Sequence, residues 1–119
     1  MTNEDLRKEY PDLFEGCWEI STGNGWLPMI SLLARYLDSW NARDCIRNDC
    51  APVRVCQVKE KFGSLRFYVD GGNDYTYGLI SFAEGMSHII CEMCGNPGTT
   101  EGPGWYKTLC VPCRSSKDE

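Results

Sequence analysis

Two Cys-x-x-Cys pairs near the C-terminal end constrain this chain more than any other feature of its sequence. Cys91 and Cys94 form the first pair, Cys110 and Cys113 form the second, and fifteen residues separate the pairs. This spacing is typical of a zinc site with four thiolate ligands. Two intervening residues allow a tight turn that directs both sulfur atoms of a pair to one point. We therefore predict one zinc ion bound by these four cysteines.

The residues around the pairs refine this prediction. Gly95 follows the first pair and suits a tight turn, because glycine adopts positive φ without steric cost. Arg114 occupies the equivalent place after the second pair, where Pro112 stiffens the turn from inside instead. Four thiolates fill a tetrahedral coordination sphere and leave no open position. The expected role of the Zn²⁺ is therefore structural and not catalytic.

The remaining candidate ligands have weaker patterns. Cys17, Cys45, Cys50 and Cys56 are loosely spaced and contain no Cys-x-x-Cys pair, so buried reduced thiols are favoured over a second metal site. His88 stands three residues before the first pair, an offset that shares a helical face. It offers a replacement ligand or a neighbour of the site, although four cysteines already complete the coordination.

Length and charge limit the classes of protein. A chain of 119 residues corresponds to one compact domain or to one domain with a small appended module. The net charge of −5 argues against non-specific nucleic-acid binding, which depends on lysine and arginine neutralising phosphates. No stretch approaches the ~20 apolar residues that span a bilayer. The polar N-terminus lacks the apolar region of a signal peptide, so we expect a cytoplasmic protein with reduced thiols.

Three helices are predicted. The first begins after Thr2 as N-cap and ends near Tyr10, before a proline. The second has Pro28 in its first turn, and the third begins between residues 74 and 76. The apolar face expected on the second helix consists of Leu27, Ile30, Leu33, Ala34, Leu37 and Trp40. The apolar face expected on the third consists of Leu79, Phe82, Ala83, Met86 and Ile90.

The middle of the chain has the alternation of β-structure. Segments 53–61 and 65–69 are rich in β-forming residues and flank Phe62-Gly63-Ser64, which predicts an antiparallel hairpin. Segments 15–25 and 41–52 are rich in turn-forming or polar residues and are expected to be turns and loops.

These elements predict an α+β fold in a small single domain spanning residues 1–119. Amphipathic helices would pack on an antiparallel β-hairpin within an α+β core, residues 1–90. A zinc-ribbon-like module would follow at residues 91–113, and residues 114–119 would form a flexible tail.

The hairpin carries the main binding hypothesis. Lys59, Lys61 and Arg66 lie close to Phe62 and Tyr68, and positive groups beside aromatic rings can hold a phosphate and stack a base. Strand alternation places the two lysines on one face, and Arg66 and Tyr68 on one face. The alternative is a solvated sheet surface with ordinary salt bridges. No glycine-rich phosphate loop supports the phosphate interpretation.

No catalytic residues are predicted. The chain has a single histidine, and it contains neither a Ser–His–Asp order nor a His-Glu-x-x-His motif. Glu60, Asp70 and Asp74 offer magnesium ligands, but their spacing is not diagnostic. A pocket gathering Glu60, Asp74 and His88 would be the sign of an enzyme.

The run from Gln57 to Tyr68, together with Gly25-Trp26 and Cys91-Glu-Met-Cys94-Gly95, resembles a motif of small uncharacterised bacterial, phage and prophage proteins. The resemblance covers residues 23–113. It implies a compact α+β protein with a C-terminal zinc-ribbon-like unit, but it implies no particular enzymatic activity. It implies a phage-encoded protein that binds a host protein and inhibits a host enzyme or defence system. The alternative function is a nucleotide or nucleic-acid binder that uses the 57–68 hairpin.

Overall fold

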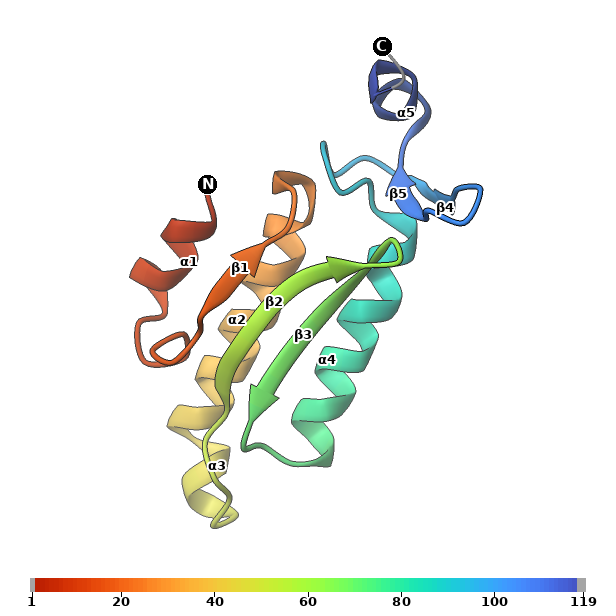
Figure 1. The fold of residues 1–119 in the computed structure, drawn as a ribbon. Helices are drawn as coiled ribbons and strands as arrows, with labels where there is room; N and C mark the ends of the chain where they lie inside the picture. The colour runs from red at the N-terminus through yellow and green to blue at the C-terminus, as the bar shows by residue number, and fades with distance from the viewer. Residues whose placement is uncertain (1, 118–119) are drawn as a thin grey trace.

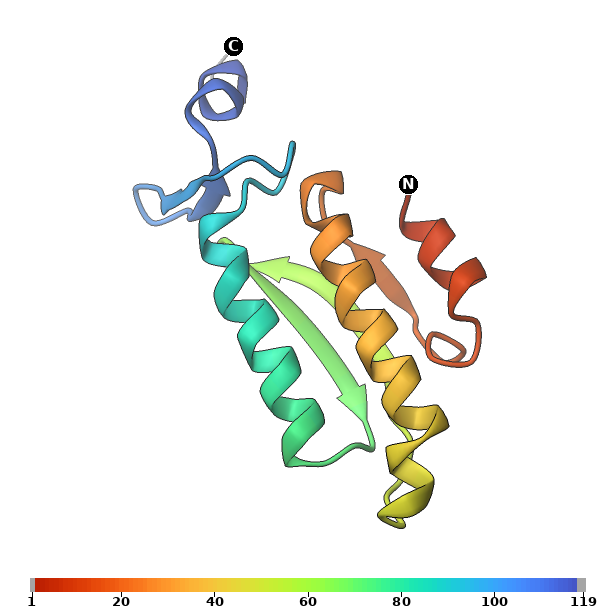
Figure 2. The same cartoon turned by 180° about the vertical axis from the view of Figure 1, so that it is seen from behind.

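A computed structural model describes residues 2–117 of the chain, which adopt an α+β fold (Figure 1). A three-stranded sheet forms one layer, and two long helices lie against one of its faces, as Figure 2 shows from behind. The strands are β1 (Glu19–Ser21), β2 (Arg54–Lys61) and β3 (Ser64–Asp70), in the order β1-β2-β3. The molecule is elongated, with principal extents of 51 × 26 × 21 Å.

The predicted hairpin is confirmed as β2 and β3. Its turn has positive φ at Phe62 (54°) and Gly63 (83°), which is the twist favoured in two-residue hairpin loops. Val58 pairs with Phe67 and faces the core, whereas the next pair, Lys59 and Arg66, faces away from it. The alternation of the sequence therefore separates a buried face of the sheet from an open one.

The prediction that segment 15–25 contains only turns is wrong, because β1 lies within it. This strand pairs in parallel with β2, and Ile20 stands opposite Val58. The Asn3 side-chain amide also donates to the Ile20 carbonyl across 3.0 Å. A three-residue strand has no detectable local pattern, and long-range pairing stabilises it. The segment ends in the 3-10 helix η1 (Asn24–Trp26).

The first two helices form as predicted. Helix α1 (Asn3–Glu9) begins after Thr2, whose backbone N–H donates to the Asp5 carboxylate across 2.7 Å. Helix α2 (Leu27–Ala42) packs on the sheet through its expected apolar face. All six predicted core residues of α2 are buried: Leu27, Ile30, Leu33, Ala34, Leu37 and Trp40.

The expected loop at 41–52 contains the short helix α3 (Asp44–Arg47), which corrects the prediction for that segment. Cys45 is buried there, and its thiol donates to the Cys50 carbonyl across 2.7 Å. The Asn41 side chain pairs with both backbone groups of Val53, at 2.8 and 3.0 Å. Segment 41–52 is thus held in place by hydrogen bonds that its polar composition does not predict.

Helix α4 (Asp74–Met86) starts where predicted, and its N-cap Asn73 accepts from the Thr76 backbone N–H across 3.2 Å. Its predicted buried face is confirmed in part, because Ala83 is buried and Leu79 and Ile90 pack against the core. The buried residues of α4 and the following 3-10 helix η2 (Ser87–Ile89) are Thr76, Ile80, Ala83 and Ser87. Phe82, which the pattern assigns to the core, is 72% exposed.

The free edge of β3 explains this orientation of α4. The Leu65 backbone N–H donates to the Ser87 hydroxyl across 2.9 Å, and the Phe67 N–H donates to the Glu84 carboxylate across 2.9 Å. Polar residues of the helix therefore satisfy edge groups of the sheet that would otherwise be available to another chain. These bonds turn the Ser87 side of the helix toward the sheet and leave Phe82 outward.

The C-terminal residues 91–117, here called the cysteine module, lie at one end of the molecule (Figure 1). They contain β4 (Thr99–Glu101), β5 (Lys107–Leu109) and helix α5 (Val111–Lys117). The tail expected to be flexible from residue 114 is helical as far as Lys117, and residues 118–119 lie outside the described residues. Among residues 2–117, no helix is long and apolar enough to cross a membrane.

Candidate metal centre

The two cysteine pairs meet at one point. The sulfur atoms of Cys91, Cys94, Cys110 and Cys113 all lie within 4.8 Å of one another, and those of Cys94 and Cys110 are 3.6 Å apart. A tetrahedral zinc site with ~2.3 Å bonds separates its sulfur atoms by about 3.8 Å. The predicted convergence is confirmed, and the cluster is compatible with a structural zinc ion.

A tight turn positions the first pair. The Gly95 backbone N–H donates to the Cys91 carbonyl across 2.9 Å, and the Cys91 N–H donates to the Asn96 carbonyl across 2.7 Å. Gly95 has φ of 84°, as the sequence predicted for a residue in this turn. The turn brings both sulfurs to the same side of the backbone.

The second pair uses a helix instead. Cys110 precedes α5 and Cys113 lies in its first turn, where the Arg114 N–H donates to the Cys110 carbonyl across 3.0 Å. No glycine is needed because this backbone continues as a helix. The Arg114 guanidinium donates to the carbonyls of Thr99 (2.7 Å) and Lys107 (3.2 Å) and so ties β4, β5 and α5 together.

The electrostatics of the four thiols favour a cation. Burial raises the pKa of Cys91, but backbone N–H groups led by that of Cys110 outweigh it and lower the pKa to about 6. Hydrogen bonds with the Cys110 and Cys94 thiols raise the pKa of Cys113 to about 12. Neighbouring thiols therefore share protons, because several adjacent thiolates repel one another. A divalent cation would remove that penalty by replacing the protons.

The cysteine module is bonded tightly to the start of α2. The Gly25 N–H donates to the Glu92 carbonyl across 2.7 Å, and the Trp26 indole donates across 2.8 Å to the carbonyl of Ile90, the residue just before the module. The Gly23 N–H donates to the Glu92 carboxylate across 2.9 Å. A Cβ at Gly25 would lie only 2.2 Å from the carbonyl oxygen of Cys91. Glycine at position 25 therefore allows the turn that carries Cys91 and Cys94, here called the first knuckle, to contact the helical core.

The module is also bonded to the tip of the hairpin. The Lys107 ammonium lies 2.9 Å from the Glu60 carboxylate, which also accepts from the Gly63 N–H across 2.8 Å. The Thr108 hydroxyl donates to the Gly63 carbonyl across 2.5 Å. Glu60 thus supports the hairpin tip.

The other candidate ligands do not join the centre. His88 is exposed, and its Nδ1 lies 3.1 Å from the Thr100 hydroxyl. Within residues 2–117, no second group of three potential ligands converges. The thiol of Cys17 donates to the Glu19 carbonyl and that of Cys45 to the Cys50 carbonyl, so these buried cysteines bind backbone. The enzyme pocket also does not form, because Asp74 and His88 lie at opposite ends of α4 and η2.

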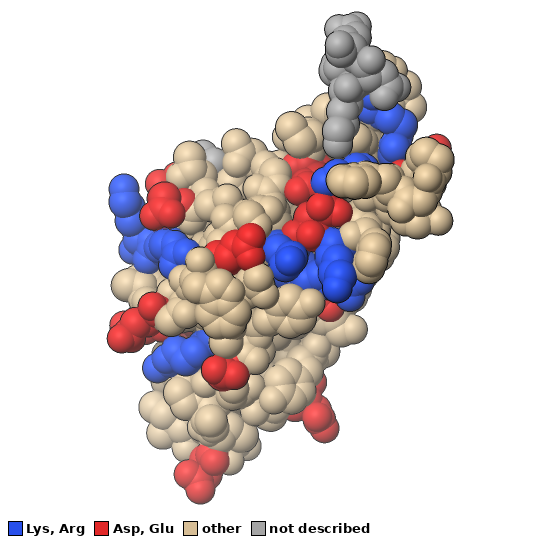
Figure 3. Space-filling model, viewed as in Figure 1, with Lys and Arg blue, Asp and Glu red and all other residues tan. Residues whose placement is uncertain are grey.

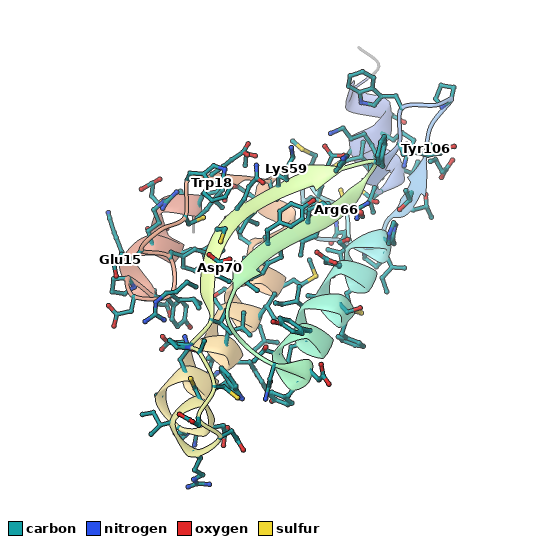
Figure 4. All side chains as sticks on the ribbon, turned by 60° about the horizontal axis from the view of Figure 1, so that its bottom comes forward. Glu15, Trp18, Lys59, Arg66, Asp70 and Tyr106 are labelled. Atoms are coloured by element: carbon teal, nitrogen blue, oxygen red, sulfur yellow. The ribbon has the colours of Figure 1, made fainter. Side chains whose placement is uncertain are left out.

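Lys59 and Arg66, two of the predicted binding residues, lie on the outer face of the sheet (Figure 4). Lys59 stands directly opposite Arg66, and Tyr68 stands beside them opposite Gln57. Lys and Arg side chains gather over this part of the sheet, next to acidic side chains (Figure 3). Within the described chain, neither Lys59 nor Arg66 forms a salt bridge, and the Arg66 Nε is buried without a hydrogen-bond partner.

The hairpin tip meets aromatic residues that the sequence patterns did not indicate. Phe62 is 63% exposed, Trp105 is 76% exposed, and Tyr106 is half-exposed beside them. With Lys61, whose ammonium lies 5.5 Å from the centre of the Phe62 ring, they line a hollow of about 260 Å³. The only sequence signal was a pair of aromatic residues in a glycine-rich loop, and local spacing does not connect that loop to the hairpin.

Comparisons with models of protein families, with characterised proteins and with solved structures give no match.

Proposed function

We propose that this chain is a structural-zinc protein that acts by binding another protein through its hairpin tip. The observation that supports this most directly is the aromatic cluster of Phe62, Trp105 and Tyr106. Its members come from two segments, held together by the Glu60–Lys107 ion pair and by the cysteine module. Zinc would fix this arrangement by tying the loop between the two cysteine pairs to the core.

The chemistry of the tip fits a protein interface. Tryptophan, tyrosine and arginine dominate the binding energy of such interfaces, and aromatic rings lose little conformational entropy when they are buried. Exposure of Phe62 and Trp105 costs about 25 cal/mol per Å² of apolar surface, and folding gains nothing from it. Lys61 at the rim of the hollow favours a partner with an apolar anchor and an acidic surround.

The resemblance to bacterial and phage proteins selects the class of partner. A protein of this kind acting in a bacterial cytoplasm would meet host enzymes and defence proteins. We propose inhibition by binding as its mode of action, because it has a built surface for contact but no predicted catalytic residues.

The test is an affinity capture from bacterial lysate with zinc-loaded wild-type protein, with Trp105→Ala and with Ile46→Ala. Ile46 is a matched control because it is 78% exposed in α3, far from the tip. We expect a specific protein with the wild type and the control, and its loss or strong reduction with Trp105→Ala. A wild-type capture without a specific protein, or one unchanged by Trp105→Ala, would contradict the proposal.

A second candidate function is the binding of a nucleotide or nucleic acid on the outer sheet face. The specific observation is the unpartnered Nε of Arg66 beside Lys59, because a bound phosphate would satisfy this buried donor. Tyr68 on the same face offers a ring for base stacking.

Salt dependence tests this second candidate. We expect nucleotides or oligonucleotides to raise thermal stability, affinity to fall steeply with added salt, and Lys61→Ala to reduce the slope. Arg47→Ala, an exposed arginine in α3, is the control. Unchanged thermal stability with every nucleotide and oligonucleotide tested would rule it out.

A further inference from the structure

An apolar groove runs between α2 and α4 on the side of the helices that faces away from the sheet, the side seen in Figure 2. Its volume is about 520 Å³, and no charged side chain lines it. Leu33 and Ala83 form its buried floor, whereas Leu32 and Tyr36 of α2 are half-exposed at its rim. An outward helix face in water is normally polar, so this surface calls for a physical explanation.

The α4 wall of the groove forms a ridge. Leu79, Phe82 and Met86 follow one another along α4 at the spacing of one helical face, and Phe82 is 72% exposed. Periodicity assigns this stripe to the core, and Leu79 does pack against it, but Phe82 is turned outward. One surface of the chain therefore carries both a protruding ring and an apolar groove.

We propose that this surface is the interface of a homodimer, in which the Phe82 ring of each copy enters the groove of the other. A two-fold contact joins the same surface on both copies, so it must be self-complementary. A ridge along one wall of a groove meets that condition. The two copies would bury four helices between two sheets, and both open sheet faces and both hairpin tips would stay outside.

The exposed apolar area agrees with what a dimer needs. Leu32, Tyr36 and Phe82 are each more than half-exposed, and Pro28 in the lining of the same groove is also exposed. Taking ~200 Å² for a large side chain, they expose on the order of 400 Å² per copy, or about 800 Å² in a pair. A standard interface buries roughly 1,200–2,000 Å² and is about 65% apolar in homodimers, so it needs some 800–1,300 Å² of apolar surface.

The charge of the chain opposes self-association but does not prevent it at this surface. Each copy carries −5, so contact between two copies requires a surface that adds no local repulsion. The groove lining meets this requirement because it holds no charged side chain. It also offers no ionic group with which to select an acidic or basic peptide.

The experiment is sedimentation equilibrium of the zinc-loaded full chain over a series of concentrations. The variants are Phe82→Glu, Leu32→Glu on the facing helix, and Phe62→Glu as the matched control. Phe62 is exposed to a similar extent at the hairpin tip, outside the groove. We expect a wild-type dimer, a Kd about 30-fold weaker or more for the two groove variants, and an unchanged Kd for Phe62→Glu.

Two results would overturn the proposal. One is a wild-type protein that remains monomeric at all concentrations, and the other is a dimer whose Kd is insensitive to both groove substitutions. Circular dichroism and zinc content identify a variant that fails to fold, and the other groove variant then decides. The same Phe62→Glu protein should lose partner capture while keeping the dimer, so failure of one proposal is distinguishable from failure of the other.

Discussion

Replacing Gly25 by alanine tests the coupling between the cysteine module and the core. The new Cβ would lie 2.2 Å from the Cys91 carbonyl oxygen and 2.5 Å from the Gly95 backbone nitrogen. Both neighbours are backbone atoms of the first knuckle, so neither can move aside without displacing the knuckle itself. The substitution must therefore separate the knuckle from the start of α2.

The magnitude follows from the hydrogen bonds that this separation breaks. Gly25 N–H to Glu92 carbonyl, Trp26 indole to Ile90 carbonyl, and Gly23 N–H to Glu92 carboxylate all cross the same junction. At about 1 kcal/mol each, their loss lowers the free energy of unfolding by about 3 kcal/mol. For a small domain with about 5–15 kcal/mol of stability, this is a large change.

Urea denaturation of the zinc-loaded protein measures this change, and Gly85→Ala provides the matched control. Gly85 lies in α4, and a Cβ added there would meet no atom within 4 Å, so alanine should stabilise the helix by roughly 0.5–1 kcal/mol. The two glycine substitutions thus have opposite expected signs. A Gly25→Ala protein within about 0.5 kcal/mol of wild type would refute the argument.

Zinc content, a buried hydrogen bond and a carboxylate each give a further prediction. Elemental analysis of reduced protein should give one zinc per chain. A chelator should unfold at least residues 88–113, measured as a loss of amide hydrogen-exchange protection. The reason is that structural zinc contributes ~10–16 kcal/mol of apparent folding free energy. Ser87→Ala should lower the free energy of unfolding in urea by about 1–3 kcal/mol, since it leaves the buried Leu65 N–H without an acceptor; an unchanged value would mean that another group replaces the hydroxyl. Hydrogen bonds from Gln57 and then Ser21 hold the pKa of Glu19 below its usual value. The ionised carboxylate therefore stabilises the fold at pH values above the unfolded-state pKa. This stabilisation is lost as the pH falls through the lower folded-state pKa. The stability difference between wild type and Glu19→Gln should accordingly shrink in acid, and a difference independent of pH would contradict this.

Features that depend on local spacing could be predicted from the amino-acid sequence. Two residues between cysteines place both sulfurs of a pair on one turn, so the four candidate ligands were predictable. The apolar face of α2 follows the 3.6-residue period and is buried as predicted. Alternation on either side of Phe62-Gly63 was enough to identify the hairpin, and the strand register then placed Lys59 opposite Arg66.

Features that depend on distant segments emerged only in the folded chain. Strand β1 exists because β2 offers it a parallel partner, and no signal within three residues predicts that. Helix α4 is apolar on two sides, and its orientation is set by the Ser87 and Glu84 bonds to the β3 edge. Trp105 and Tyr106 join Phe62 because Lys107 and Thr108 bind the hairpin tip. Periodicity shows which side chains avoid water, but long-range hydrogen bonds choose which of them the fold covers and which it leaves for a partner.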